Sequence, residues 1–169
     1  MAKEQSLVLI KPDGIVKSLT GNIISIISES KLKVVGAKLI RVSEELAKKH
    51  YIKHEGKDFY SGLIKYLTGG AQFHTNRVLA LVYEGEDAIR KLRNLVGDKN
   101  PELAHPTTIR GKYGRIHSST GVFENVIHAS DTQEEAEREI KLWFSPGELA
   151  NVIFPAKEQE VSKKEKVWA

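Results

Sequence analysis

Short runs of β-forming apolar residues alternate along this chain with segments of helical periodicity, and this alternation restricts the fold more than any other feature. The spacing predicts strands at residues 6–10, 33–42, 77–84 and 123–128. It predicts helices at residues 22–30, 44–54, 58–68, 86–96 and 133–144. Elements in this order favour an α/β sandwich in which helices cover one sheet. A length of 169 residues suits one domain, with at most a short appendage.

Turn and capping residues mark the ends of these elements. Lys11-Pro12-Asp13-Gly14 is predicted to form a turn after the first strand. Ser43 is a candidate N-cap, and Gly97 is a candidate helix stop. Three candidate N-caps, Ser130-Asp131-Thr132, precede the last helix, and residues 98–121 are predicted to form a long polar loop.

Composition excludes several classes of protein. The chain contains no cysteine, so disulfides, thiolate metal sites and cysteine catalysis are excluded. The longest clean apolar runs, Leu7–Ile10 and Val78–Val82, are too short for a transmembrane helix, and the first five residues are not followed by the apolar core of a signal peptide. We therefore expect a cytoplasmic protein without a membrane partner. The charge-rich end predicts a division into a domain at residues 1–155 and a loosely attached charged tail at residues 156–169.

Phosphate chemistry in this chain would depend on cationic side chains. The Gly-rich phosphate loops Gly-x-x-x-x-Gly-Lys-Ser/Thr and Gly-x-Gly-x-x-Gly are absent. The whole chain has 26 basic and 22 acidic residues, a net charge of +4, whereas residues 88–115 alone carry seven basic and two acidic residues, a local +5. Such a segment suits a polyphosphate. A solvated helix face followed by a surface loop is the alternative, and composition alone favours it.

His128 is the candidate nucleophile. It lies at a predicted strand end, directly before a capped helix N-terminus, where a phosphorylated oxyanion is favoured. Neutral imidazole is a competent nucleophile at physiological pH. Glu139 lies seven residues after Thr132, on the same helix face, where it could orient the ring. The alternative is an ordinary core or surface histidine, which is also our interpretation of His50, His54, His74, His105 and His117.

Three motifs together resemble the nucleoside diphosphate kinase family: Lys11-Pro12-Asp13-Gly14, Thr108-Ile109-Arg110-Gly111 and Asn125-Val126-Ile127-His128-Ala129-Ser130-Asp131. The similarity runs from about Ser6 to Leu149. It implies an α/β (α+β) fold, namely a ferredoxin-like sandwich with a four-stranded antiparallel sheet covered by helices and an inserted helical hairpin. It also implies ping-pong transfer of the γ-phosphoryl group from a nucleoside triphosphate such as ATP to a nucleoside diphosphate, which maintains NTP and dNTP pools.

The resemblance also assigns roles to individual residues. His128 matches the family's phosphorylated histidine, Glu139 matches the carboxylate that positions it, and Ser130 assists. The groups that hold phosphates and ribose correspond to Lys11, Arg93, Arg110 and Asn125. Tyr51 corresponds to a residue beside the catalytic histidine and Lys11. The base would stack on Phe59, with Leu63 and Val122 as apolar neighbours, although from the sequence alone Tyr51 and Phe59 also fit core packing. Mg²⁺ would arrive with the nucleotide phosphates, and Asp131 would at most touch its water shell.

The chain departs from the family pattern at four places. Lys99 stands where a threonine commonly contacts phosphate. Residues 71–76 look like an insertion, and the loop at 111–121 is longer than usual. Phe123-Glu124 replace the usual Gly-Arg. Family members form hexamers or tetramers, and we expect a homo-oligomer here, with a hexamer favoured over a tetramer.

Two other functions compete with the kinase. One is a nucleic-acid-binding module on the same ferredoxin-like scaffold, which the basic composition favours. RNA-binding versions need aromatic residues on exposed central strands, however, and the predicted strands at 6–10 and 78–82 are aliphatic. The other is a catalytically silent paralogue, which the retention of the matched phosphate ligands, apart from Lys99, opposes. We expect no required nucleic acid.

Overall fold

The fold is built on one antiparallel sheet. The computed structural model describes residues 3–160, apart from the side chains of residues 71 and 72. Four strands, β1 (Glu4–Ile10), β2 (Lys33–Arg41), β3 (Arg77–Gly85) and β6 (Ile127–Ala129), pair in the order β2-β3-β1-β6. Every neighbouring pair is antiparallel. This is the four-stranded sheet that the resemblance implied, and the expected fold class is confirmed.

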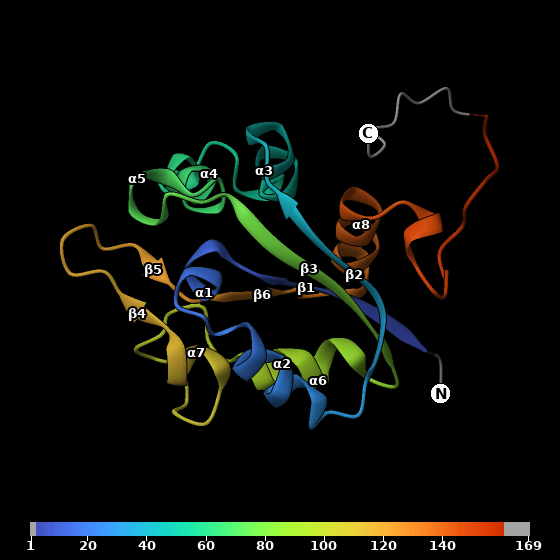
Figure 1. Ribbon diagram of the computed structural model, residues 1–169, viewed down its shortest axis with the longest axis horizontal. Helices are drawn as coiled ribbons and strands as arrows, with labels where there is room; N and C mark the ends of the chain where they lie inside the picture. Colours follow the sequence, from blue (N-terminus) through green and yellow to red (C-terminus); the bar gives the residue numbers. More distant parts are fainter. Residues whose placement is uncertain (1–2, 161–169) are drawn as a thin grey trace, which may run out of the picture.

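Helices cover both faces of this sheet (Figure 1). On one side lie α2 (Thr20–Ser28) and α6 (Ala88–Val96). On the other lie α3 (Glu44–His50), α4 (Tyr60–Leu67) and α8 (Gln133–Trp143). The pair α3 and α4, joined by the short 3-10 helix η1 (Ile52–His54), is the helical hairpin inserted between β2 and β3.

The central strand β1 contributes side chains to the core on both faces of the sheet. Its side chains alternate between the two faces, so Leu7 and Leu9 join the core under α3, α4 and α8. Val8 and Ile10 join the core against α2 and α6. All four side chains are fully buried, which explains why this strand is a continuous apolar run instead of an alternating one.

The predicted caps are observed at three helix ends. The Ser43 hydroxyl accepts the backbone N–H of Leu46 at 3.1 Å at the start of α3. Of the three candidates before α8, Thr132 is the N-cap and accepts the N–H of Glu135 at 3.2 Å. Gly97 ends α6 at φ +85°, and a Cβ there would lie 2.3 Å from the Thr108 hydroxyl, so this position requires glycine.

Several sequence-based boundaries were wrong. Residues 11–14 do not form a simple turn, because the short helix α1 (Pro12–Val16) starts there with Pro12 in its first turn. The predicted loop 98–121 contains α7 (Ile109–Tyr113) and β4 (Arg115–Ile116). The predicted helix 44–54 ends at His50, and Gly70 starts a further short helix, α5 (Gly70–Phe73), within the suspected insertion. Elements this short carry too few periodic positions to stand out in a sequence.

The predicted strand 123–128 is split into β5 (Phe123–Glu124) and β6. Val126 interrupts it with φ +55°, a conformation that is rare for a β-branched residue. Glu124, where the family pattern has arginine, is 1 % exposed and accepts hydrogen bonds from Lys17 and Arg115, each at 2.7 Å. The pair with Arg115 lies within the β4–β5 hairpin, and the pair with Lys17 connects this hairpin to the end of α1.

The segment after α8 folds back onto the sheet. The short 3-10 helix η2 (Pro146–Glu148) leads to Ala150, whose N–H donates to the Val35 carbonyl at 2.6 Å. Phe154 packs against the core. The expectation of a loose tail from residue 156 falls partly on residues 161–169, which lie outside the described part of the chain. Across residues 3–160 we find no helix with the length and apolar character needed to cross a membrane.

Candidate active site

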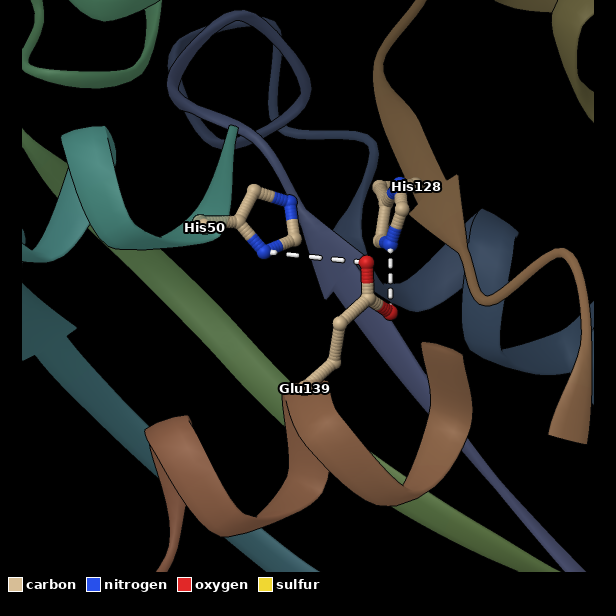
Figure 2. A group of neighbouring side chains, drawn as sticks. All are labelled: His50, His128 and Glu139. Carbon is tan, nitrogen blue, oxygen red and sulfur yellow. Dashed lines mark hydrogen bonds and ion pairs between the residues drawn. The ribbon is translucent and has the colours of Figure 1, made fainter. Parts of the chain in front are cut away.

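His128 lies on β6, opposite Leu9 of β1, and its side chain is 17 % exposed. Its Nε2 atom is 3.0 Å from Oε2 of Glu139 on α8 (Figure 2). The Ser130 hydroxyl donates to the same carboxylate oxygen at 2.7 Å. An ionised carboxylate only accepts hydrogen bonds, so Nε2 carries the ring proton and donates it to Glu139. The Nδ1 lone pair is therefore available for attack.

Glu139 is suited to hold this tautomer because it stays ionised. Burial by itself raises the pKa of this carboxyl, which is 3 % exposed. His128, His50 and the Ser130 hydroxyl outweigh burial and lower the pKa to about 2. The charge on Glu139 persists over the whole physiological range.

A tight turn at Val126 separates Asn125 from His128. The Ile127 N–H donates to the Asn125 carbonyl at 2.6 Å, two residues back. The Asp13 carboxylate accepts the Val126 N–H at 3.0 Å, and the Lys11 N–H donates to the Val126 carbonyl at 2.9 Å. Such a backbone conformation costs about 1–3 kcal/mol and persists only where surrounding contacts enforce it. The Lys11–Gly14 segment supplies those contacts.

Lys11 is a buried cation next to this turn. Its Nζ donates to Oδ1 of Asn125 at 2.7 Å and lies 5.0 Å from the centre of the Tyr66 ring. Burial and the nearby Arg110 lower the pKa of Lys11 to about 7, although Asp13 opposes them. The ammonium therefore lacks a full counter-charge, which a phosphate would supply.

Arg110 is the second buried cation, at 4 % exposure. The helix α7, capped by Thr108, directs its guanidinium to the carbonyls of Gly97 at 3.1 Å and Ile127 at 2.9 Å. Its Nε is buried without a hydrogen-bond partner among residues 3–160. Burial and the charge of Arg93 lower the pKa of Arg110 to about 10, so it remains protonated.

The other residues with roles assigned from the sequence range from buried to exposed. Arg93 pairs with Asp131 at 2.9 Å, and both line a surface hollow of about 420 Å³. Tyr51 is buried, whereas Phe59 is 54 % exposed and contacts His54 at 5.6 Å between ring centres. Leu63 and Val122 are half-buried. Lys99 is exposed, and its carbonyl accepts from Asn125 at 2.9 Å.

The model of the nucleoside diphosphate kinase family matches residues 4–149. Nucleoside diphosphate kinases of Staphylococcus epidermidis and Staphylococcus aureus are 44 % and 43 % identical over 152 residues, which is 90 % of this chain and 95 % of each of those proteins. The chain belongs to the nucleoside diphosphate kinase family.

Solved members of the nucleoside diphosphate kinase family share the fold as well as the sequence. A Halobacterium salinarum enzyme in complex with CDP is 40 % identical with a TM-score of 0.78, covering 89 % of this chain and 93 % of that one. A Borrelia burgdorferi enzyme with bound vanadate and ADP is 35 % identical with a TM-score of 0.77, covering 89 % and 92 %. Membership of this family does not support the nucleic-acid-binding alternative. That alternative also needs an exposed central strand, whereas β1 is buried on both faces.

Several residues of the candidate site were not predicted from the sequence. Asp13 holds the turn at Val126, and its place in Lys11-Pro12-Asp13-Gly14 was the available signal. His50, interpreted as an ordinary histidine, lies beside His128 with its ring 4.7 Å away. Trp143 donates to His50, which no local pattern indicates. Lys57 lies 5.7 Å from the centre of the Phe59 ring.

Within residues 3–160, three side chains with metal-ligating atoms come within 4.8 Å of one another: His50, His128 and Glu139 (Figure 2). Nδ1 of His50 already accepts the indole N–H of Trp143 at 3.2 Å, and Nε2 of His128 donates to Glu139. Both nitrogens that face the carboxylate are thus engaged. We interpret the group as a hydrogen-bonded support for His128 instead of a metal site.

Proposed function

We propose that this chain is a nucleoside diphosphate kinase that transfers the γ-phosphoryl group of a nucleoside triphosphate to a nucleoside diphosphate through phosphohistidine 128. The observation that carries this proposal is the contact between Nε2 of His128 and the ionised Glu139. That contact leaves Nδ1 as the nucleophilic nitrogen, in a segment whose Asn125 side chain and Ile127 carbonyl accept hydrogen bonds from the buried cations Lys11 and Arg110. Membership of the family gives the reaction class, and the geometry supports the assignment of atoms.

The reaction divides into two transfers of one phosphoryl group. Nδ1 of His128 attacks the γ-phosphorus, an N–P bond forms, and the bond from that phosphorus to the β,γ-bridging oxygen breaks. The nucleoside diphosphate leaves with that oxygen, while the Nε2 proton stays on the ring and donates to Glu139. A second nucleoside diphosphate then attacks through a terminal β-phosphate oxygen and breaks the N–P bond. One site can serve both partners in turn because the intermediate is covalent.

Lys11, Arg93 and Arg110 would hold the phosphates, since phosphoryl transfer depends mainly on positioning and on neutralising the phosphate oxygens. The Arg93–Asp131 ion pair would open to free the guanidinium. Mg²⁺ bound to the nucleotide would neutralise further phosphate charge. The residues present fit an ion held by phosphates and water, because the resemblance assigns it a single carboxylate, Asp131, which would at most contact its water shell.

Phe59 would stack on the base, with Leu63 and Val122 as apolar neighbours, and its exposed ring leaves a face available. Stacking makes no hydrogen-bond demand, so we propose that purine and pyrimidine nucleotides are both accepted. Asn125 would contact the ribose or phosphates, Lys99 would contact phosphate, and Tyr51 would support His128.

We further propose a cytoplasmic homo-oligomer, with a hexamer favoured over a tetramer. The strand β2 lies at the edge of the sheet and exposes Val34 and Leu39 by 51 % and 58 %, which favours self-association. The division into a catalytic domain at residues 1–155 and a tail at residues 156–169 is likewise a proposal.

Brief incubation with γ-labelled ATP and Mg²⁺ tests the function. We expect a phosphoprotein that is labile in acid and stable in alkali, as phosphoramidates of histidine are, and that transfers its label to added GDP. Peptide mapping should place the label on His128. A label on another residue, or a phosphoprotein that cannot be discharged by GDP, would contradict the proposal.

The lowered pKa of Lys11 predicts proton uptake when a nucleotide binds. At pH 8 a lysine with a pKa of about 7 is only about one-tenth protonated, and phosphate binding favours the charged form. We expect uptake of about one proton per ADP at pH 8, and a roughly tenfold fall in affinity from pH 8 to pH 9. Calorimetry in buffers of different ionisation enthalpy measures this uptake. The variant Lys11→Arg, which stays charged, should bind ADP without it; equal uptake by both proteins would refute the assignment.

A further inference from the structure

His50, the last residue of α3, has a side chain that is 1 % exposed and lies directly beside the proposed nucleophile. The two imidazole rings are 4.7 Å apart between centres and stand at 84° to one another. Figure 2 shows the edge of His50 that carries Nε2 directed at the face of the His128 ring. This buried ring takes no part in either of the two phosphoryl transfers.

Trp143 determines which nitrogen of His50 carries the proton. Its indole N–H can only donate, and it lies 3.2 Å from Nδ1 of His50, so Nδ1 must accept. The hydrogen of the neutral ring is therefore on Nε2. This N–H is buried and has no hydrogen-bond partner among residues 3–160, a state that is unfavourable unless another group receives it.

His50 is also held in the neutral form. Burial lowers its pKa well below the usual value, and the charges of His128, Lys11 on the strand end and Arg138 on α8 lower it further, against the opposing effect of Glu139. Because the ring is neutral, its Nδ1 and Oε1 of Glu139, which lie 3.8 Å apart, do not form an ion pair. A neutral ring with a fixed tautomer presents a constant dipole to His128.

We propose that His50 is a positioning residue for the reaction: its Nε2–H edge, fixed by the indole of Trp143, rests on the face of the His128 ring and holds that ring in the plane in which Nδ1 is directed away from Glu139. The edge of an aromatic ring is electropositive and its face electronegative, so an N–H edge that rests on a ring face is a favourable contact. The contact with His50 fixes the plane of the His128 ring, whereas the hydrogen bond to Glu139 fixes the position of only one of its nitrogens. The inference rests on the proposed function, since it concerns the nucleophile of that reaction.

Three variants test this role: His50→Phe, His50→Gln and Trp143→Phe. Phenylalanine keeps a ring edge but has no N–H, whereas the glutamine amide can place an N–H near the position of Nε2. Trp143→Phe removes the donor that fixes the tautomer and leaves His50 in place. Tyr83→Phe, a buried hydroxyl deletion in the opposite core layer, is the matched control for core substitution.

The measurement is the rate of phosphorylation by ATP, together with the KM for ATP and the melting temperature. We expect His50→Phe and Trp143→Phe to slow phosphorylation about three- to tenfold with the KM for ATP nearly unchanged. His50→Gln should restore most of the rate.

Two results would overturn the inference. One is a His50→Phe protein that is phosphorylated at the wild-type rate. The other is a loss that appears equally in His50→Gln and follows melting temperature alone, as a purely structural role requires. Because the wild-type protein is measured first, failure of the proposed function appears separately, as absence of the phosphoprotein itself.

Discussion

The variant His128→Ala is expected to form no phosphoprotein and to lose phosphoryl transfer by at least about 10⁴-fold. The reason is chemical: the proposed intermediate exists only as a bond to Nδ1 of His128, and alanine has no nitrogen that could form it. Coupled assays of ATP formation and single-turnover labelling measure the two losses separately.

ADP binding separates this chemical loss from damage to the fold. Lys11, Arg93 and Arg110 remain in the His128→Ala variant, so its affinity for ADP should stay within about threefold of the wild type. The exposed His105 provides the matched control, and His105→Ala should retain full activity. If His128→Ala turned over ATP and GDP normally while folded, His128 would not be the nucleophile.

The second large effect is expected for Glu139→Gln, with a fall of about 10²–10⁴-fold in the phosphorylation rate. The neutral amide binds the Nε2 proton less strongly than the carboxylate does. Its NH₂ group can also reverse the hydrogen bond, which moves the ring proton to Nδ1 and removes the attacking lone pair. Single-turnover labelling by ATP is the measurement, with KM for ATP expected to change little.

Two further variants test whether the lower phosphorylation rate of Glu139→Gln arises from its altered contact with the His128 ring. Ser130→Ala removes one of the hydrogen bonds to the carboxylate and should cause a smaller loss in the same direction. Glu137, on the solvent side of the same helix, forms an ion pair with the exposed Lys141, and Glu137→Gln should behave as wild type. A Glu139→Gln protein within fivefold of the wild-type rate would show that Glu139 does not set the tautomer.

The sequence alone allowed prediction of most of the fold. The strands around 6–10, 33–42 and 77–84 and the helix before Gly97 follow from local periodicity and caps, and their observed ends differ by only a few residues. The three motifs led to the family, which is confirmed. Roles assigned through that resemblance to residues such as Arg93 and Phe59 stay predictions.

Local patterns did not reveal the break at Val126 or the short elements within 98–121. Valine rarely adopts a positive φ because its side chain is β-branched. Contacts from Asp13 and Lys11, more than 100 residues away along the chain, stabilise this conformation at Val126. The conformation is thus a property of the assembled fold, so periodicity predicted an uninterrupted strand.

Neighbouring residues alone predict the order of the main strands and helices, the family and the candidate nucleophile, because hydrophobic periodicity, capping residues and motifs are local in the chain. The tautomers of the two active-site histidines, by contrast, follow from contacts that form only in the folded protein. Nε2 of His128 meets Glu139, and Nδ1 of His50 meets Trp143, only after β6, α3 and α8 have packed together. Which nitrogen holds a proton depends on the partner within about 3 Å, and partners 93 residues apart are brought to that distance by folding alone.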